Sequence, residues 1–227
     1  MSSFMLRRNG GLSRPSWRAF SSTLQSRSNQ IRNNSMQGAA AGVIGSGGAL
    51  GTNWSIPNQR GLTATVGAPT TQKGIDTNTV RLNGTPSSSG QVVIAFEAAN
   101  QIAAALGQVW TASVFRAFSA GAKTNVAGIA LAMMELDSGG GFLETDNGPD
   151  VTTIIDPVLT RYSFTNTLSN ALTAFVRPMV VMTVTSGQAL DITYTIGWPQ
   201  MELASAASSP IRTVSAARLG VHVSAGR

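Results

Sequence analysis

Carboxylates are the side chains of this sequence with the widest scope for chemistry, since its 227 residues include ten acids, one histidine and no cysteine. Without a thiol, and with His222 as the one candidate base, a Ser-His-Asp or Cys-His arrangement is not indicated. Cleavage of a glycosidic bond needs only two suitably spaced carboxylates, and the candidates are Glu97, Glu135, Glu144 and Glu202. Because ten acids make some pair inevitable, we rank a polysaccharide-degrading enzyme last and expect no catalytic activity.

A second group of acids surrounds a glycine-rich stretch, residues 138–149, that we interpret as a loop. Calcium prefers oxygen ligands of the kind that such a loop supplies. The candidate calcium ligands are Asp137, Glu144, Asp146 and Asp150. The alternative is that these carboxylates are solvated on a surface loop, and the sequence indicates no other cofactor.

Tryptophan rings are the groups on which a protein most readily stacks a sugar. Trp110 and Trp198 fall in alternating apolar runs, so we expect both to be core residues. Trp54 lies in a Thr-Asn-Trp turn and is the candidate for glycan contact, with packing against the body as the alternative. Aromatic residues make up only 6% of the chain, so an extended glycan-binding platform is not predicted.

The net charge of +6 comes from the first 32 residues, which we call the basic arm. The arm contains no acid, whereas ten basic and ten acidic residues cancel in the remainder. We predict that arginines of the arm pair with acidic groups of neighbouring subunits while two aromatic rings fill pockets. The predicted anchoring residues are Arg7, Arg8, Arg14, Trp17, Arg18, Phe20, Arg27 and Arg32. Contact with DNA inside a particle, simple solubility and an organellar transit peptide are the alternatives.

The elements that must position these residues are β-strands. Only 11% of the residues are charged, and apolar or alternating runs are separated by Gly, Pro, Asn and Ser clusters, as in an all-β sandwich. The expected strands are residues 62–66, 79–83, 91–96, 110–118, 126–135, 159–165, 172–184 and 190–198. The last two are expected to pair as a hairpin, because only a short turn separates them. The alanine-rich residues 97–106 form either one short helix or an extended loop.

Three stretches of the body carry a family resemblance. They are Asn33-Asn34-Ser35-Met36-Gln37-Gly38-Ala39 with Thr52-Asn53-Trp54, then Gly107-Gln108-Val109-Trp110-Thr111-Ala112-Ser113, and last Gly197-Trp198-Pro199-Gln200-Met201-Glu202-Leu203-Ala204 with Ser208-Ser209-Pro210-Ile211-Arg212-Thr213. In order and spacing they resemble the opening, a core strand and the ending of jelly-roll domains of carbohydrate-binding-module type in phage head-fibre and tail proteins. Three positions depart from the family pattern, namely Gly51, Met201 and Pro210.

The resemblance covers residues 33–213 and implies an antiparallel β-sandwich in a virion protein. We therefore divide the chain into the basic arm (1–32), a jelly-roll sandwich (33–213) and a C-terminal tail (214–227). The favoured hypothesis is a bacteriophage structural protein, either a head decoration, a head fibre or a tail protein. The arm would anchor it to capsid or tail subunits, and the sandwich would face outward.

The alternative hypothesis is a glycan-binding adhesin module that attaches the particle to the host surface. Under either hypothesis we expect a homo-oligomer, with a trimer as the favoured state. No run approaches the roughly 20 apolar residues of a membrane-spanning helix, so no span is expected. The neutral body is not expected to bind nucleic acid.

Overall fold

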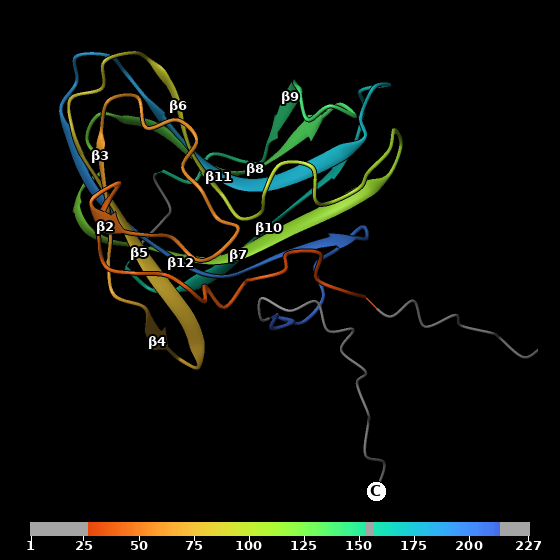
Figure 1. The fold of residues 1–227 in the computed structure, drawn as a ribbon, viewed down its shortest axis with the longest axis horizontal. Coiled ribbons are helices and arrows are strands. Elements are labelled where there is room, and N and C mark those ends of the chain that lie inside the picture. The colour runs from red at the N-terminus through yellow and green to blue at the C-terminus, as the bar shows by residue number, and fades with distance from the viewer. Residues whose placement is uncertain (1–26, 153–156, 214–227) are drawn as a thin grey trace, which may run out of the picture.

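The computed structural model describes residues 27–152 and 157–213, which fold into two packed β-sheets (Figure 1). The larger sheet has the strand order β10 (Thr160–Thr167), β7 (Val109–Ala122), β12 (Leu190–Leu203), β5 (Ile75–Gly84), β3 (Thr63–Val66), β1 (Gly42–Ile44) and β2 (Gly47–Gly48), with β4 (Thr70–Gln72) paired to β5. The smaller sheet has the order β6 (Gly90–Ala95), β11 (Phe175–Val184), β8 (Val126–Leu136) and β9 (Phe142–Asn147). Strands pair antiparallel except β1 with β2.

The inner faces of the two sheets enclose one apolar core. Its completely buried side chains include two from the larger sheet and three from the smaller one: Leu82, Ile192, Ile94, Ile129 and Val180. Each such burial stabilises the fold by about 1.5–3 kcal/mol relative to exposure. A second apolar cluster lies on the other face of the smaller sheet and consists of Val93, Ala95, Ala130, Ala132, Met179 and Val181. β11 is therefore apolar on both faces.

These features confirm the predicted all-β sandwich. Each of the eight predicted strand ranges overlaps an observed strand of the same position in the chain. Residues 97–106 contain no helix, which agrees with the extended-loop alternative. β9 was not predicted, because its sequence Phe-Leu-Glu-Thr-Asp-Asn follows a glycine cluster and carries two acids. Within the described residues, no helix is long and apolar enough to cross a membrane.

The predicted hairpin of β11 and β12 is wrong. β11 pairs with β6 and β8 in the smaller sheet, whereas β12 pairs with β5 and β7 in the larger one. The short turn between them therefore crosses from one sheet to the other. Both strands alternate apolar residues toward the same core, and this pattern is identical whether two consecutive strands share a sheet or face each other.

Trp110 is a core residue, as predicted, but Trp198 is only half-buried. The pairing of β12 with β7 shifts register between Gly197 and Gln200, and Trp198 adopts a left-handed backbone conformation with φ of 37°. This bulge ends the alternation that buries Leu190 to Ile196. The indole nitrogen of Trp198 instead donates to Asp76 over 3.3 Å.

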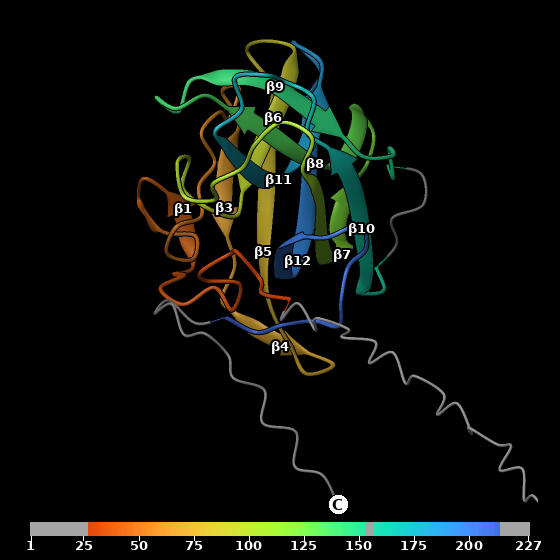
Figure 2. The same ribbon diagram turned by 90° about the vertical axis from the view of Figure 1, so that its right-hand side faces the viewer.

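The sandwich begins before the predicted boundary at residue 33. Ile31 is completely buried in the main core, and the backbone nitrogen of Gln30 donates to the carbonyl of Met201 over 2.8 Å. Residues 27–34 and 204–213 lie side by side at the lower end of the sandwich in Figure 2. The last part of the basic arm is thus a structural part of the body.

Replacing Ile31 with alanine tests this boundary. Because the side chain is completely buried, Ile31→Ala should lower the free energy of unfolding by about 2–5 kcal/mol. The matched control is Val43→Ala at a position that is 38% exposed, where the change should stay within about 0.5 kcal/mol. Urea denaturation measures both values. Equal, small losses would show that residues before 33 do not support the fold.

Candidate functional site

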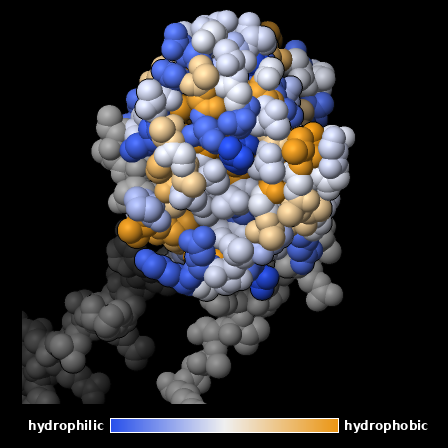
Figure 3. Space-filling view, turned by 90° about the vertical axis from the view of Figure 1, so that its left-hand side faces the viewer, coloured by the Kyte–Doolittle hydropathy of each residue, from blue (hydrophilic) through white to orange (hydrophobic). Residues whose placement is uncertain are grey.

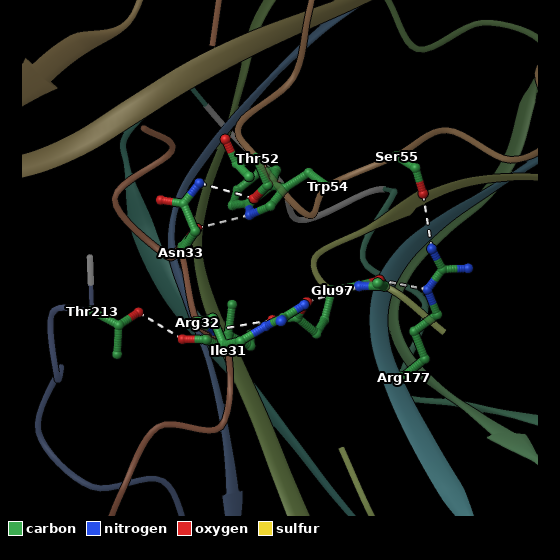
Figure 4. A network of polar contacts seen from close by, with 10 residues as sticks. Ile31, Arg32, Asn33, Thr52, Trp54, Ser55, Glu97, Arg177 and Thr213 are labelled. Carbon is green, nitrogen blue, oxygen red and sulfur yellow. Dashed lines mark hydrogen bonds and ion pairs between the residues drawn. The ribbon is translucent and has the colours of Figure 1, made fainter. Parts of the chain in front are cut away.

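The N-terminal residues of the body are tied to its C-terminal residues by side-chain hydrogen bonds, and Figure 4 shows the one between Thr213 and Ile31. Asn34 accepts from the backbone nitrogen of Thr213 over 2.7 Å and donates to the carbonyl of Ile211 over 2.6 Å. The hydroxyl of Thr213 donates to the carbonyl of Ile31 over 2.6 Å. An amide side chain offers both a donor and an acceptor, so Asn34 joins two segments that no strand pairing connects.

A buried carboxylate reinforces this junction. Glu97 is completely buried and accepts from the backbone nitrogen of Arg32 over 3.0 Å and from its guanidinium over 2.7 and 3.3 Å. The hydrogen bond to Glu97 raises the pKa of Arg32. Arg177 donates to the Glu97 carbonyl over 2.7 Å and to Ser55 over 2.8 Å, and burial lowers its pKa. Arg32 thus pairs within its own chain, with a residue of the body.

Trp54 lies in the same network and is 8% exposed. Its indole nitrogen donates to the carbonyl of Asn33 over 2.9 Å, and its ring packs against Phe96 with the ring centres 5.0 Å apart. A ring that stacks on a sugar needs an exposed face. The structure therefore argues against the predicted glycan contact at Trp54 and supports the packing alternative.

The other predicted anchoring residues divide into two groups. Arg27 is exposed and donates to the carbonyl of Ala206 over 2.9 Å. The remaining six lie outside the described residues: Arg7, Arg8, Arg14, Trp17, Arg18 and Phe20. The predicted C-terminal tail, residues 214–227, lies outside them as well.

The four candidate calcium ligands do not form one site. Asp137 accepts from the backbone nitrogens of Gly139 and Gly141, both over 2.8 Å. Asp150 accepts from Ile129 and Thr152, both over 2.9 Å, and these bonds lower its pKa. Within residues 27–152 and 157–213, no three carboxylate or histidine side chains are grouped to hold a metal ion. The loop prediction failed because residues 142–147 form β9, which spreads these acids along an extended strand.

Two of the candidate catalytic acids do meet. Glu135 and Glu144 lie opposite each other on β8 and β9, and Asp146 lies beside them. Glu135 is completely buried and accepts from the backbone of Ser169 over 3.1 Å and from the hydroxyl of Thr173. Burial, reinforced by the hydrogen bond and charge of Glu135, raises the pKa of Asp146 to about 6. The group therefore holds an extra proton in mildly acidic solution.

The other two candidates, Glu97 and Glu202, are separate from this group. Glu97 is held in the N-terminal network, as described above. Glu202 is buried and accepts from Gln200 over 2.6 Å and from Ser208 over 2.6 and 2.9 Å. Both acids thus have partners that fix the first and last described segments to the sandwich.

A pocket of about 220 Å³ opens between the two sheets near β10. One charged side chain, Arg116 of β7, lines it together with seven other residues: Leu131, Gly148, Pro149, Val151, Tyr162, Ser163 and Phe164. The Arg116 guanidinium lies over the ring of Tyr162, 3.6 Å from its centre. Gly148 lets the chain pass close to β8 and β10, because a Cβ there would lie 2.9 Å from both the Leu131 carbonyl oxygen and the Phe164 ring.

Arg116 is 2% exposed, yet it forms no ion pair with any described residue. Two of its nitrogens, Nε and Nη1, are buried without a hydrogen-bond partner. An uncompensated buried charge costs several kcal/mol, whereas a cation-π contact returns about 2 kcal/mol. Sequence reasoning missed this residue, although one signal was available: Arg116 follows Trp110, Ala112 and Val114 on the inward face of β7.

No protein-family model and no curated protein matches this sequence. Among solved structures, the chain is similar to the CBM22-1 xylan-binding domain of Paenibacillus barcinonensis Xyn10C, with 12% identity and a TM-score of 0.48 over 80% of this chain and 97% of that domain. It is also similar to the enzymatically active domain of bacteriophage CBA120 tailspike protein 4, with 11% identity and a TM-score of 0.42 over 67% of this chain and 20% of that one.

A third similar structure is the tripod from the baseplate of bacteriophage Tuc2009, with 18% identity and a TM-score of 0.41 over 63% of this chain and 51% of that one. The chain is thus an all-β two-sheet sandwich that resembles carbohydrate-binding modules. At these identities the likeness concerns the fold and carries no function to this chain.

The network at Glu97 yields a stability prediction. Arg32→Met leaves a completely buried carboxylate without its cation, so it should lower the free energy of unfolding by about 3 kcal/mol. The control is Arg81→Met, which breaks a solvated ion pair with Asp191 and should have a much smaller effect. Urea denaturation of both variants checks this. Equal effects would mean that the Arg32 pair is no more important than a surface contact.

The acidic group yields a pH prediction. Because the pKa of Asp146 rises from 3.8 to about 6 on folding, its ionisation lowers the free energy of unfolding as pH increases from about 4 to above 6. Asp146→Asn should therefore raise that free energy by about 1 kcal/mol at pH 7.5, a value that allows for partial solvation. The gain should disappear at pH 4. Urea denaturation at both pH values measures it, and a loss at pH 7.5 would contradict the assignment.

Proposed function

We propose that this chain is a non-enzymatic structural protein of a bacteriophage particle, anchored by the basic arm to capsid or tail subunits. The observation that carries the proposal is the junction at Asn34 and Glu97. It makes the basic arm leave the sandwich at one fixed place, beside the other described end of the chain. A cationic segment that starts from a rigid point can engage a neighbour while the rest of the sandwich stays accessible.

The distribution of charge supports anchoring through the basic arm. The net charge of +6 resides in the arm, and the remainder of the chain is neutral. Arginines pair readily with the carboxylates of a neighbouring subunit. The aromatic residues Trp17 and Phe20 add the type of side chain that contributes most to protein interfaces.

Exposed leucines at the same end of the sandwich also support a contact there. Leu203 ends β12 opposite Trp110, near the start of β7, and is 51% exposed. Leu106 precedes β7 and Leu172 follows β10, and both are more exposed still. The face shown in Figure 3 differs, because its apolar residues occur in separate groups among polar ones. Neighbouring subunits would cover the leucine end, and assembly as a homo-oligomer remains a prediction.

Deletion of residues 2–26 tests the anchoring proposal. The deletion spares Ile31, Arg32 and Asn34, so the protein should keep its melting temperature while its copy number per particle falls at least tenfold. In a second variant, glutamine replaces the arginines at positions 7, 8, 14 and 18, which separates charge from length. Quantitative mass spectrometry of purified particles gives the copy number. Normal incorporation of the deletion variant would refute the proposal.

Glycan binding is the second candidate function, and the pocket at Arg116 is the observation that favours it. A concave, mostly apolar site with one charged group is the usual form of a small-molecule site. It replaces Trp54 as the candidate contact. One protein can both be anchored in a phage particle and bind a glycan.

A further inference from the structure

The pocket at Arg116 has the properties of an anion site. Arg116 is almost completely buried, lacks a carboxylate partner among the described residues and has two nitrogens without hydrogen bonds. Buried cations in proteins are normally paired. A ligand carboxylate that enters the pocket would supply the missing countercharge.

A buried hydroxyl group lies beside the arginine. Arg116 is opposite Ile196 in the pairing of β7 with β12, and Tyr194 is two residues along the same face of β12. The Tyr194 hydroxyl is completely buried beside the Arg116 guanidinium and is not part of the pocket lining. Burial raises the pKa of Tyr194 to about 12, against the opposing effects of the Arg116 charge and of a hydrogen bond with Arg116. The hydroxyl therefore stays protonated near neutral pH and does not neutralise the charge of Arg116.

Acidic residues near the pocket have other partners. Asp150 lies between the lining residues Pro149 and Val151, but its carboxylate accepts from Ile129 and Thr152. The acidic group at Asp146 contacts Asn166, which is two residues beyond the lining residue Phe164. Neither acid reaches Arg116 closely enough to form an ion pair. The positive charge in the pocket is therefore not neutralised by the described residues.

The walls and the size of the pocket restrict the ligand further. Leu131, Pro149, Val151 and Phe164 supply apolar surface that suits the C–H face of a ring. The volume of about 220 Å³ is below the roughly 300–1,000 Å³ of pockets that hold drug-sized molecules. It suits a single ring. A sugar acid combines a carboxylate with such a ring and with hydroxyl acceptors for the remaining donors.

We propose that this pocket binds the carboxylate-bearing sugar residue of an acidic polysaccharide, such as a uronate or a sialate, with Arg116 as the countercharge. The proposal deepens the glycan-binding candidate and is independent of anchoring through the basic arm. It identifies the ligand by its negative charge rather than by stacking on an exposed tryptophan.

Titration of the full-length protein with monosaccharides tests the proposal. The probes are glucuronate and N-acetylneuraminate, with glucose and N-acetylglucosamine as neutral counterparts and with acetate and sulfate as small anions. Amide chemical shifts should move first at Val151 and Ser163, and at least one sugar acid should bind at least tenfold more tightly than the neutral sugars and the small anions. Equal binding of acetate would mean that the pocket recognises charge alone, which overturns the sugar assignment.

Variants assign the effect to the arginine. Arg116→Met should weaken binding of the sugar acid at least tenfold without lowering the melting temperature, because the replaced charge is unpaired. Arg81→Met, which removes the same charge from an exposed position, should leave binding unchanged. If Arg116→Met does not fold, Tyr162→Leu serves as the second variant, since it removes the ring under the guanidinium. Unchanged affinity in the folded variant would overturn the proposal.

The results of these experiments distinguish the acidic-sugar proposal from anchoring through the basic arm and from glycan binding in general. Particles that carry Arg116→Met should retain the normal copy number, because the arm is intact. Binding of neutral sugars with shifts outside the pocket would overturn the acidic-sugar proposal but keep the glycan-binding candidate. Absence of binding by every sugar would remove both, and anchoring through the basic arm would still stand on the deletion of residues 2–26.

Discussion

The burial of one carboxylate, Glu97, determines how the first described residues of the chain are held against the sandwich. A buried negative charge requires a cation and hydrogen-bond donors, and Arg32 supplies both through its guanidinium and its backbone nitrogen. This pairing holds residues 29–34 against the body, where Asn34 can tie them to Thr213. The basic arm therefore starts from a rigid point, which is the structural basis of the proposed anchoring.

The sandwich itself combines a conventional core with two polar features inside it. Apolar side chains from both sheets fill most of the interior, but the acidic group at Glu135 and the cation at Arg116 also lie between the sheets. The acidic group is stabilised by hydrogen bonds and an added proton, whereas Arg116 contacts the ring of Tyr162 and the Tyr194 hydroxyl and has no acidic partner among the described residues. This difference is the reason why we propose a binding role for the arginine and a structural role for the acids.

The alternation of apolar residues predicted the class of fold and the position of each main strand, because burial of one strand face leaves a direct pattern in the sequence. It did not predict which strands pair, since β11 and β12 show the same pattern across two sheets as they would within one. Trp198 is not a core residue because the bulge after Gly197 turns its side chain to the other face of the sheet. The candidate binding site was harder to predict from the sequence than the strand pairing. A single arginine on an inward face becomes meaningful only when the structure shows that no acid lies opposite it.

The central claim is that the end of the sandwich that carries Asn34 and Thr213 faces the particle. Cryo-electron microscopy of the intact particle tests it most directly. The account predicts that this end abuts neighbouring subunits, that density for residues 1–26 continues between them, and that the pocket at Arg116 opens to the exterior. A map in which that end points outward, with the sandwich attached through its smaller sheet, would contradict the account.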